Sequence, residues 1–130
     1  MKSLSVRQPW TDAIFLRGKD VENRTFRTNY RGPLLIQASK TIDREELRKG
    51  GERQDSFVTG AIIGIVDLTD VVDKSPSCWA QPDCWHWLLA NRRLLAEPIA
   101  CAGKTGIFEV EIPLGALKKA QTPNPKGENL

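Results

Sequence analysis

The chain has 130 residues, of which 40% are hydrophobic and 27% are charged, and its formal net charge is +3. This length and composition fit one globular domain and exclude a disordered chain, which would be poorer in apolar residues. No apolar run reaches the roughly 20 residues that a membrane-spanning helix needs, and the first residues lack the apolar stretch of a signal peptide. Three cysteines are too few for a disulfide framework. We therefore expect a cytoplasmic protein with no membrane association.

The positive charge is concentrated in the first half of the chain. Residues 1–65 hold 12 lysines and arginines against 8 aspartates and glutamates, whereas residues 66–130 hold 7 against 8. Residues 17–31 alone hold five basic and two acidic side chains, with aromatic residues among and before them. Basic and aromatic side chains together are typical of surfaces that bind nucleic acid or a nucleotide phosphate. A solvated charged face gives the same pattern, so composition leaves both interpretations open.

The spacing of apolar residues predicts five strands and two short helices. The strand segments either alternate polar and apolar side chains or form short apolar runs. Pro9 suits the first turn of a helix that Gly18 would cap, and Thr41 or Asp43 can cap the second helix. We expect strands at residues 3–6, 20–26, 34–38, 60–68 and 106–113 and helices at residues 10–17 and 41–49.

The segment from residue 73 to residue 98 is harder to interpret. Residues 73–84 predict a long loop, because prolines and small polar residues interrupt it repeatedly. Residues 85–95 fit a strand or a helix, and Pro98 is expected to end that segment in either case. Three tryptophans in this part of the chain predict a hydrophobic cluster under the loop, and one of them can border a cleft: Trp79, Trp85 and Trp87.

The order of these elements predicts an α+β fold with two or three short helices. Strands occur at both ends and in the centre of the chain, and a small mixed β-barrel is the economical way to protect so many strand edges. We assign this domain to residues 1–115. Residues 116–130 have the polar composition of a flexible C-terminal tail.

The densest group of ionisable side chains is Gly-Lys-Asp-Val-Glu-Asn-Arg at residues 18–24. If this segment is a strand, Asp20, Glu22 and Arg24 share one face and Lys19 lies at its mouth. Such a face makes a poor hydrophobic core and a good wall for a polar pocket. An exposed strand face with paired charges is the alternative.

Three segments in this order resemble the ASCH domain (activating signal cointegrator homology) of the small stand-alone bacterial and phage type. They are Leu4-Ser-Val-Arg-Gln-Pro-Trp10, Gly18-Lys-x-x-Glu-x-Arg24 and Arg31-Gly-Pro-Leu-Leu-Ile-Gln-Ala-Ser-Lys40. The resemblance implies a β-barrel of the PUA-like superfamily. It also implies a cleft between the first helix and the barrel that binds RNA or a nucleotide-like ligand, lined by Lys19, Glu22 and Arg24.

Five other residues of the first and third of these segments are further candidates for ligand binding. Arg7, Gln8 and Trp10 bring a guanidinium group, an amide and an indole to a strand–helix junction, where they can hydrogen-bond to a base and stack on it. Trp10 can instead fill the end of the barrel as a core residue. Ser39 and Lys40 precede a helix and can hold a phosphate there, or they form an ordinary cap beside a solvated lysine.

The resemblance also leaves an enzymatic role open. One branch of the family deacetylates N4-acetylcytidine with a threonine, a lysine and a glutamate, and another member has been described as a ribonuclease. Lys19 matches that lysine, but Glu22 stands at the position of the threonine. If this chain is an enzyme, Lys19 and Glu22 are the candidate catalytic residues, with Glu22 as a base acting on water.

We therefore expect a domain that binds RNA or a modified nucleoside in a polar, basic cleft. A hydrolase acting on a nucleobase amide or an RNA phosphodiester is one alternative. A protein-interaction module is another, although the sequence identifies no protein partner.

No metal or cofactor is expected. Cys78, Cys84 and His86 do not have the spacing of a zinc site. Gly103-Lys-Thr105 lacks the preceding glycine of a phosphate-binding loop.

Overall fold

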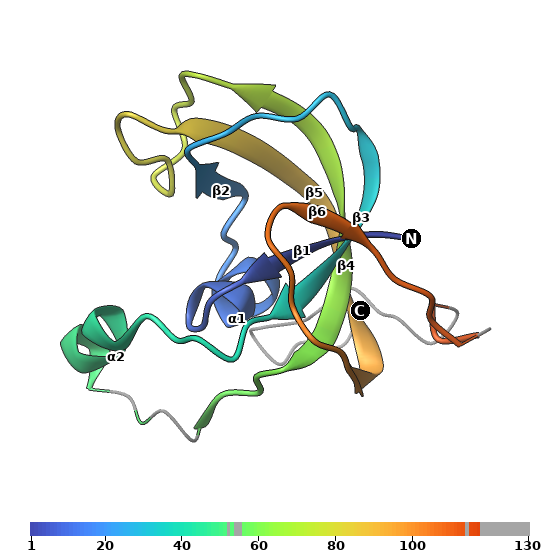
Figure 1. The fold of residues 1–130 in the computed structure, drawn as a ribbon. Helices are drawn as coiled ribbons and strands as arrows, with labels where there is room; N and C mark the ends of the chain where they lie inside the picture. Colours follow the sequence, from blue (N-terminus) through green and yellow to red (C-terminus); the bar gives the residue numbers. More distant parts are fainter. Residues whose placement is uncertain (52, 54–55, 114, 118–130) are drawn as a thin grey trace, which may run out of the picture.

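One curled sheet organises the molecule (Figure 1), and the computed structural model describes residues 1–51, 53, 56–113 and 115–117. The strands are hydrogen-bonded in the order β2-β5-β4-β3-β1-β6. Only β1 and β3 are parallel, and the other neighbours are antiparallel. The elements are β1 (Lys2–Val6), α1 (Trp10–Leu16), β2 (Val21–Arg24), β3 (Gly32–Ala38), α2 (Arg44–Gly50), β4 (Ala61–Val72), β5 (Trp85–Ala100) and β6 (Ile107–Glu109).

The sheet forms a half-barrel, which confirms the α+β class and the mixed sheet. Its two outer strands are β2 and β6, which are not paired with each other. The described residues contain two helices, and the expected number was two or three. No helix among the described residues is long and apolar enough to cross a membrane.

Apolar side chains lie on both faces of the central strands. Leu34, Leu35 and Ile36 of β3 are all fully buried. Leu34 and Ile36 belong to a larger cluster that includes Phe15 of α1, whereas Leu35 belongs to a smaller cluster with Ile62. Because alternate residues of a strand point to opposite faces, burial on both faces explains why residues 34–38 read as an apolar run.

Helix α1 packs against β3 and β5, and a glycine lets it approach the sheet closely. A Cβ atom at Gly64 would lie 2.5 Å from the carbonyl oxygen of Arg93 and 2.6 Å from the ring of Phe15. Any larger side chain at this position of β4 would therefore displace the helix or the neighbouring strand.

The segment that fitted a strand or a helix is the strand β5, and the expectation that Pro98 ends it is wrong. The strand continues to Ala100. In the pairing with β4, Gly64 lies opposite Leu94 and Ile62 lies opposite Ile99, so the intervening residues of β5 bulge out of the ladder. Pro98 lies in that bulge, where a missing N–H costs no ladder hydrogen bond.

Two expected strands are shorter in the structure, and the other three are longer. β1 begins one residue earlier than expected, and β3 begins two residues earlier. The strand expected at residues 20–26 is β2, which pairs only with residues 85–88 of β5. The strand expected at residues 106–113 is β6. It ends at Glu109, because its partner strand β1 begins at Lys2, which lies opposite Glu109. The strand expected to end at residue 68 continues to Val72 in β4.

Helix α2 begins at Arg44, three residues later than expected. Of the two residues expected to cap it, Asp43 is the N-cap. The carboxylate of Asp43 accepts a hydrogen bond from the backbone N–H of Glu46. Of the expected tail, residues 118–130 lie outside the described residues.

Candidate functional site

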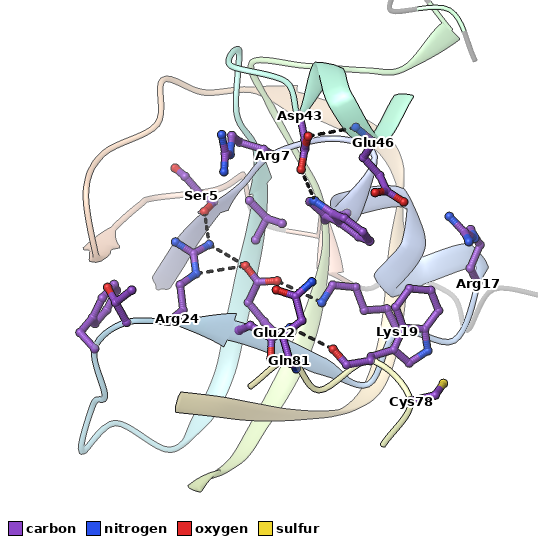
Figure 2. Close-up of a pocket in the computed structure, with 16 residues that line it drawn as sticks. Ser5, Arg7, Arg17, Lys19, Glu22, Arg24, Asp43, Glu46, Cys78 and Gln81 are labelled. Atoms are coloured by element: carbon purple, nitrogen blue, oxygen red, sulfur yellow. Dashed lines mark hydrogen bonds and ion pairs between the residues drawn. The ribbon is translucent and has the colours of Figure 1, made fainter. Parts of the chain in front are cut away.

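A pocket with a volume of about 530 Å³ lies between β1, β2 and the starts of both helices (Figure 2). This size suits a small ligand, because ligand sites commonly enclose about 300–1,000 Å³. The end of β1, residues 22–26, and the loop before β5 all contribute to its lining. The pocket therefore brings together segments that are up to about 75 residues apart in the sequence.

The floor of the pocket carries three charged side chains, Lys19, Glu22 and Arg24, which we call the charged cluster (Figure 2). The Nζ atom of Lys19 lies 3.3 Å from Oε1 of Glu22, and Nη2 of Arg24 lies 2.8 Å from Oε2. Nε of Arg24 also donates to Oε2 at 3.0 Å. The side chains of Lys19 and Glu22 are only 3% and 10% exposed. One buried carboxylate is thus shared by two cations, which leaves the cluster with a net positive charge.

Arg24 also connects the two sides of the pocket. Its Nη2 donates to the backbone oxygen of Ser5 at 2.6 Å. Ser5 lies in β1 and Arg24 in β2, and three other strands separate these two in the sheet. The polar contact therefore holds the strands at a fixed separation where backbone pairing does not.

Lys19 is held in place by the backbone as well as by Glu22. Its ammonium group donates to the backbone oxygen of Val21. An ammonium carries three N–H donors. Among the described residues, Nζ of Lys19 makes one hydrogen bond, to Val21, and one ion pair, with Glu22. At least one donor therefore remains for an acceptor in the pocket.

Two tryptophans border the pocket next to this lysine. Nζ of Lys19 lies 5.6 Å from the ring centroid of Trp10 and 5.9 Å from that of Trp79. The guanidinium carbon of Arg17 lies 5.4 Å from the ring centroid of Trp79. Cations at these distances interact favourably with indole rings. Both tryptophans are half-buried and line the pocket.

Trp10 has a structural role in addition to its place in the pocket. It packs against the larger apolar cluster, and its Nε1 donates to Oδ2 of Asp43 at 3.1 Å. Both expected roles, core packing and exposure to a ligand, are thus compatible with its position. The hydrogen bonds from the backbone of Glu46 and then from Trp10 lower the pKa of Asp43, although partial burial opposes them.

Trp79 is positioned by Asn23, which sequence reasoning did not single out. Nδ2 of Asn23 donates to the backbone oxygen of Trp79 at 2.9 Å, and its Oδ1 accepts from the backbone N–H of Gln81 at 3.0 Å. The same oxygen lies 2.9 Å from Nδ1 of His86. Asn23 therefore ties the loop at residues 73–84 to β2 and β5.

A second anchor fixes the start of this loop. The hydroxyl of Ser77 donates to Asp20 at 2.5 Å. Asp20 was expected on the same face as Glu22, but it precedes β2 and does not line the pocket. Its carboxylate holds the loop instead.

The rim of the pocket carries charges of both signs. Arg7 and Arg17 are exposed, while Asp43 and Glu46 contribute two carboxylates from the start of α2. The charged cluster adds two cations and one anion, so the pocket lining has four basic and three acidic side chains. This balance favours a ligand that combines an anionic group with a neutral polar part.

Three of the expected binding residues lie outside this pocket. Gln8 is fully buried, and its Nε2 donates to Asp12 and to the backbone oxygen of Val58, each at 2.9 Å. Ser39 and Lys40 precede the first turn of α2, which begins at Arg44. The pocket therefore brings together five of the eight expected residues: Arg7, Trp10, Lys19, Glu22 and Arg24.

No group of residues in the described part of the chain has the arrangement of a metal site. The three cysteines are free thiols, and Cys78 lies at the edge of the pocket beside Trp79. Of the expected tryptophan cluster, Trp87 is fully buried and Trp85 packs against the core, whereas Trp79 borders the pocket.

Comparison of the sequence with models of known protein families identifies the family of this chain. The family model described as the ASCH domain matches residues 4–101. The chain belongs to the ASCH domain family. The charged cluster and both pocket tryptophans lie inside the matched range of this ASCH domain. A search of curated proteins gives no match.

Proposed function

We propose that this ASCH domain binds single-stranded RNA by taking one nucleotide into the pocket of the half-barrel. The proposal includes a PUA-like architecture, which the mixed six-stranded half-barrel supports. The observation that carries it is the position of Lys19, whose partly unused ammonium group lies at the pocket floor between two indole rings.

The chemistry of the pocket suits the two parts of a nucleotide. Indole rings stack on bases of any sequence, and each such contact contributes about 1–3 kcal/mol to binding. Lys19 and the exposed guanidinium groups of Arg7 and Arg17 offer donors to a phosphate. The lone pairs left on Glu22 can accept from an exocyclic amine or a ribose hydroxyl. A base buried in a pocket of this size must be unstacked, which favours single strands over a duplex.

The test is a fluorescence-anisotropy titration of a labelled single-stranded RNA over a series of salt concentrations. Three phosphate contacts would give a slope of about −2 for log affinity against log salt, since each contact to a single strand contributes about −0.7. The variant Trp79→Ala should bind about 5- to 150-fold more weakly, which is the cost of one lost stacking contact. Lys2→Ala is the matched control, because Lys2 pairs with Glu109 away from the pocket.

Three results would contradict the proposal. Absence of binding at low salt, or binding that is independent of salt, would remove the nucleic-acid hypothesis and favour a protein-interaction module. Binding that is unchanged in Trp79→Ala would place the RNA elsewhere on the surface.

Hydrolysis of a nucleobase amide is a second candidate, favoured by the 3.3 Å contact between Lys19 and Glu22 at the pocket floor. The geometry supports it less well than binding. Both oxygens of Glu22 already accept from cations, so the carboxylate orients Lys19 and Arg24 rather than standing free beside a water. Turnover of N4-acetylcytidine that disappears in both Lys19→Ala and Glu22→Gln would establish this activity. Retained nucleoside binding without turnover would leave a binding domain.

A further inference from the structure

An exposed aromatic side chain lies at one end of the pocket. Phe26 follows β2 and contributes to the pocket lining. It is 38% exposed, and it is the one aromatic residue among the exposed large hydrophobic residues of the described chain. A single exposed apolar residue needs no functional explanation by itself, so its surroundings decide whether Phe26 has a role.

The ring of Phe26 is held in a fixed orientation. It makes an edge-to-face contact with Trp87, with 5.4 Å between the ring centroids and an angle of 86° between the planes. Nε1 of Trp87 also donates to the backbone oxygen of Phe26 at 3.1 Å. Since Trp87 is fully buried, it fixes both the backbone and the ring of its neighbour. An exposed ring that is already immobilised loses little entropy when a ligand stacks on it.

The next residue supplies an unneutralised positive charge. The guanidinium carbon of Arg27 lies 5.0 Å from the ring centroid of Trp85, and the side chain is exposed. Arg27 has no carboxylate partner among the described residues, in contrast to Arg31, which pairs with Asp70 at 3.2 Å. The indole orients the guanidinium group of Arg27 without cancelling its charge.

We propose that Phe26 and Arg27 form a second nucleotide subsite, which rests on the proposed function of the pocket. Phe26 stacks on the base adjacent to the one in the pocket, and Arg27 contacts a phosphate of the same strand. Phe26 lines the pocket beside Arg24 and Thr25, and Arg27 is the next residue of the chain, so the subsite would adjoin the pocket on this side. The preferred ligand is therefore a stretch of at least two nucleotides, not an isolated nucleoside.

The experiment compares adenosine monophosphate with the single-stranded RNA tetranucleotide of adenosine, using calorimetric titration of the full chain. The wild type should bind the tetranucleotide more tightly than the monophosphate. Phe26→Ala should weaken tetranucleotide binding by about 5- to 150-fold and should weaken monophosphate binding by a smaller factor, since Phe26 also lines the pocket. Val58→Ala is the matched control, because Val58 is 46% exposed and does not line the pocket.

Arg27 is tested separately, through the dependence of binding on salt. Arg27→Ala should make the slope of log affinity against log salt for the tetranucleotide less steep by about 0.7, and Arg27→Lys should restore most of it. A thermal melt of each variant shows whether it is folded. Phe26→Leu, which keeps the apolar volume but not the aromatic face, should lose most of the same affinity even if Phe26→Ala is unstable.

The outcomes separate the subsite from the pocket. Equal affinity of the wild type for both ligands, or equal weakening of both in Phe26→Ala, would overturn the subsite while the pocket still binds a nucleotide. Absence of binding to either ligand in the wild type would overturn both proposals. A larger loss of affinity for the tetranucleotide than for the monophosphate supports the subsite.

Discussion

The central strands of the sheet and the charged cluster shape the same half-barrel by different means. In β3, Leu34, Leu35 and Ile36 are fully buried, and apolar packing on both faces fixes the strand. At the charged cluster, the buried side chains are Lys19 and Glu22, and hydrogen bonds to charged partners fix their positions. If apolar side chains stood in place of the charged cluster, they would fill the space between β1 and β2. The charged cluster instead holds these strands apart and leaves a pocket, so its residues combine structural and functional roles.

The largest effect on stability is expected in the apolar core. Trp87→Ala removes a fully buried indole and should lower the free energy of unfolding by about 3–5 kcal/mol. Urea denaturation measures this change. A loss below about 1 kcal/mol would show that the packing around Trp87 is not what stabilises this side of the half-barrel.

Loss of the anion of the charged cluster should lower the free energy of unfolding more than loss of one of its cations. Glu22→Gln leaves Lys19 and Arg24 facing each other without a carboxylate and should cost about 3 kcal/mol, at the low end for a broken buried ion pair. In Lys19→Met, Glu22 keeps its contacts to Arg24, so we expect a loss of about 1–2 kcal/mol. Urea denaturation of both variants makes the comparison. A larger loss for Lys19→Met than for Glu22→Gln would contradict the sharing of one carboxylate by two cations.

Asn23 allows the loop at residues 73–84 to be released without removal of any charge. Asn23→Ala leaves the backbone oxygen of Trp79 and the backbone N–H of Gln81 without their partner. We expect a loss of about 1–2 kcal/mol in stability and weaker RNA binding. Hydrogen exchange at residues 77–81 should become faster. Asn29→Ala, at an exposed asparagine, is the control, and unchanged exchange in Asn23→Ala would show that the loop is held by other contacts.

The smallest expected effect concerns Asp43 and depends on pH. The pKa of Asp43 is lowered from its ordinary value of 3.8 in the folded protein, chiefly by the hydrogen bond from the backbone of Glu46. A lowered folded-state pKa contributes stability that is present above pH 4 and is lost as the pH falls through the folded-state pKa.

The variant Asp43→Asn keeps an acceptor at the cap but does not titrate. We expect it to be less stable than the wild type by at most about 1 kcal/mol at neutral pH. Thermal melts between pH 7 and pH 3 should show this difference shrinking below pH 4. A difference that is constant over this range would show that the charge of Asp43 contributes nothing to the cap.

Local patterns in the sequence predicted the parts of the fold and the site that depend on neighbouring residues. The alternation in residues 20–26 placed Glu22 and Arg24 on one face, and their contacts confirm it. Pro9 and Asp43 marked where the helices start. By contrast, bulges in the pairing of β4 with β5 disturb the alternation of residues 85–95, which is why that segment fitted two structures.

Contacts between distant segments could not be predicted in this way. Asn23 and Trp79 are 56 residues apart. The sequence indicated that one of the three tryptophans in this part of the chain can border a cleft, but it did not show which one. Gln8 was expected to bind a ligand because its amide lies at a strand–helix junction, yet this amide donates inside the fold to Asp12 and to the backbone oxygen of Val58. Only the three-dimensional arrangement separates the residues that face the pocket from those that support it.

The most direct test of the binding pocket is a nuclear magnetic resonance titration of the isotope-labelled protein with the adenosine tetranucleotide. We expect the largest shifts at backbone amides of residues 5–7, 17–27 and 78–81 and at the indole N–H groups of Trp10 and Trp79, which surround the pocket. Signals of β6 and of residues 95–99 should stay in place. Shifts confined to β6 or to residues 95–99, or no shifts at all, would contradict RNA binding at the charged cluster.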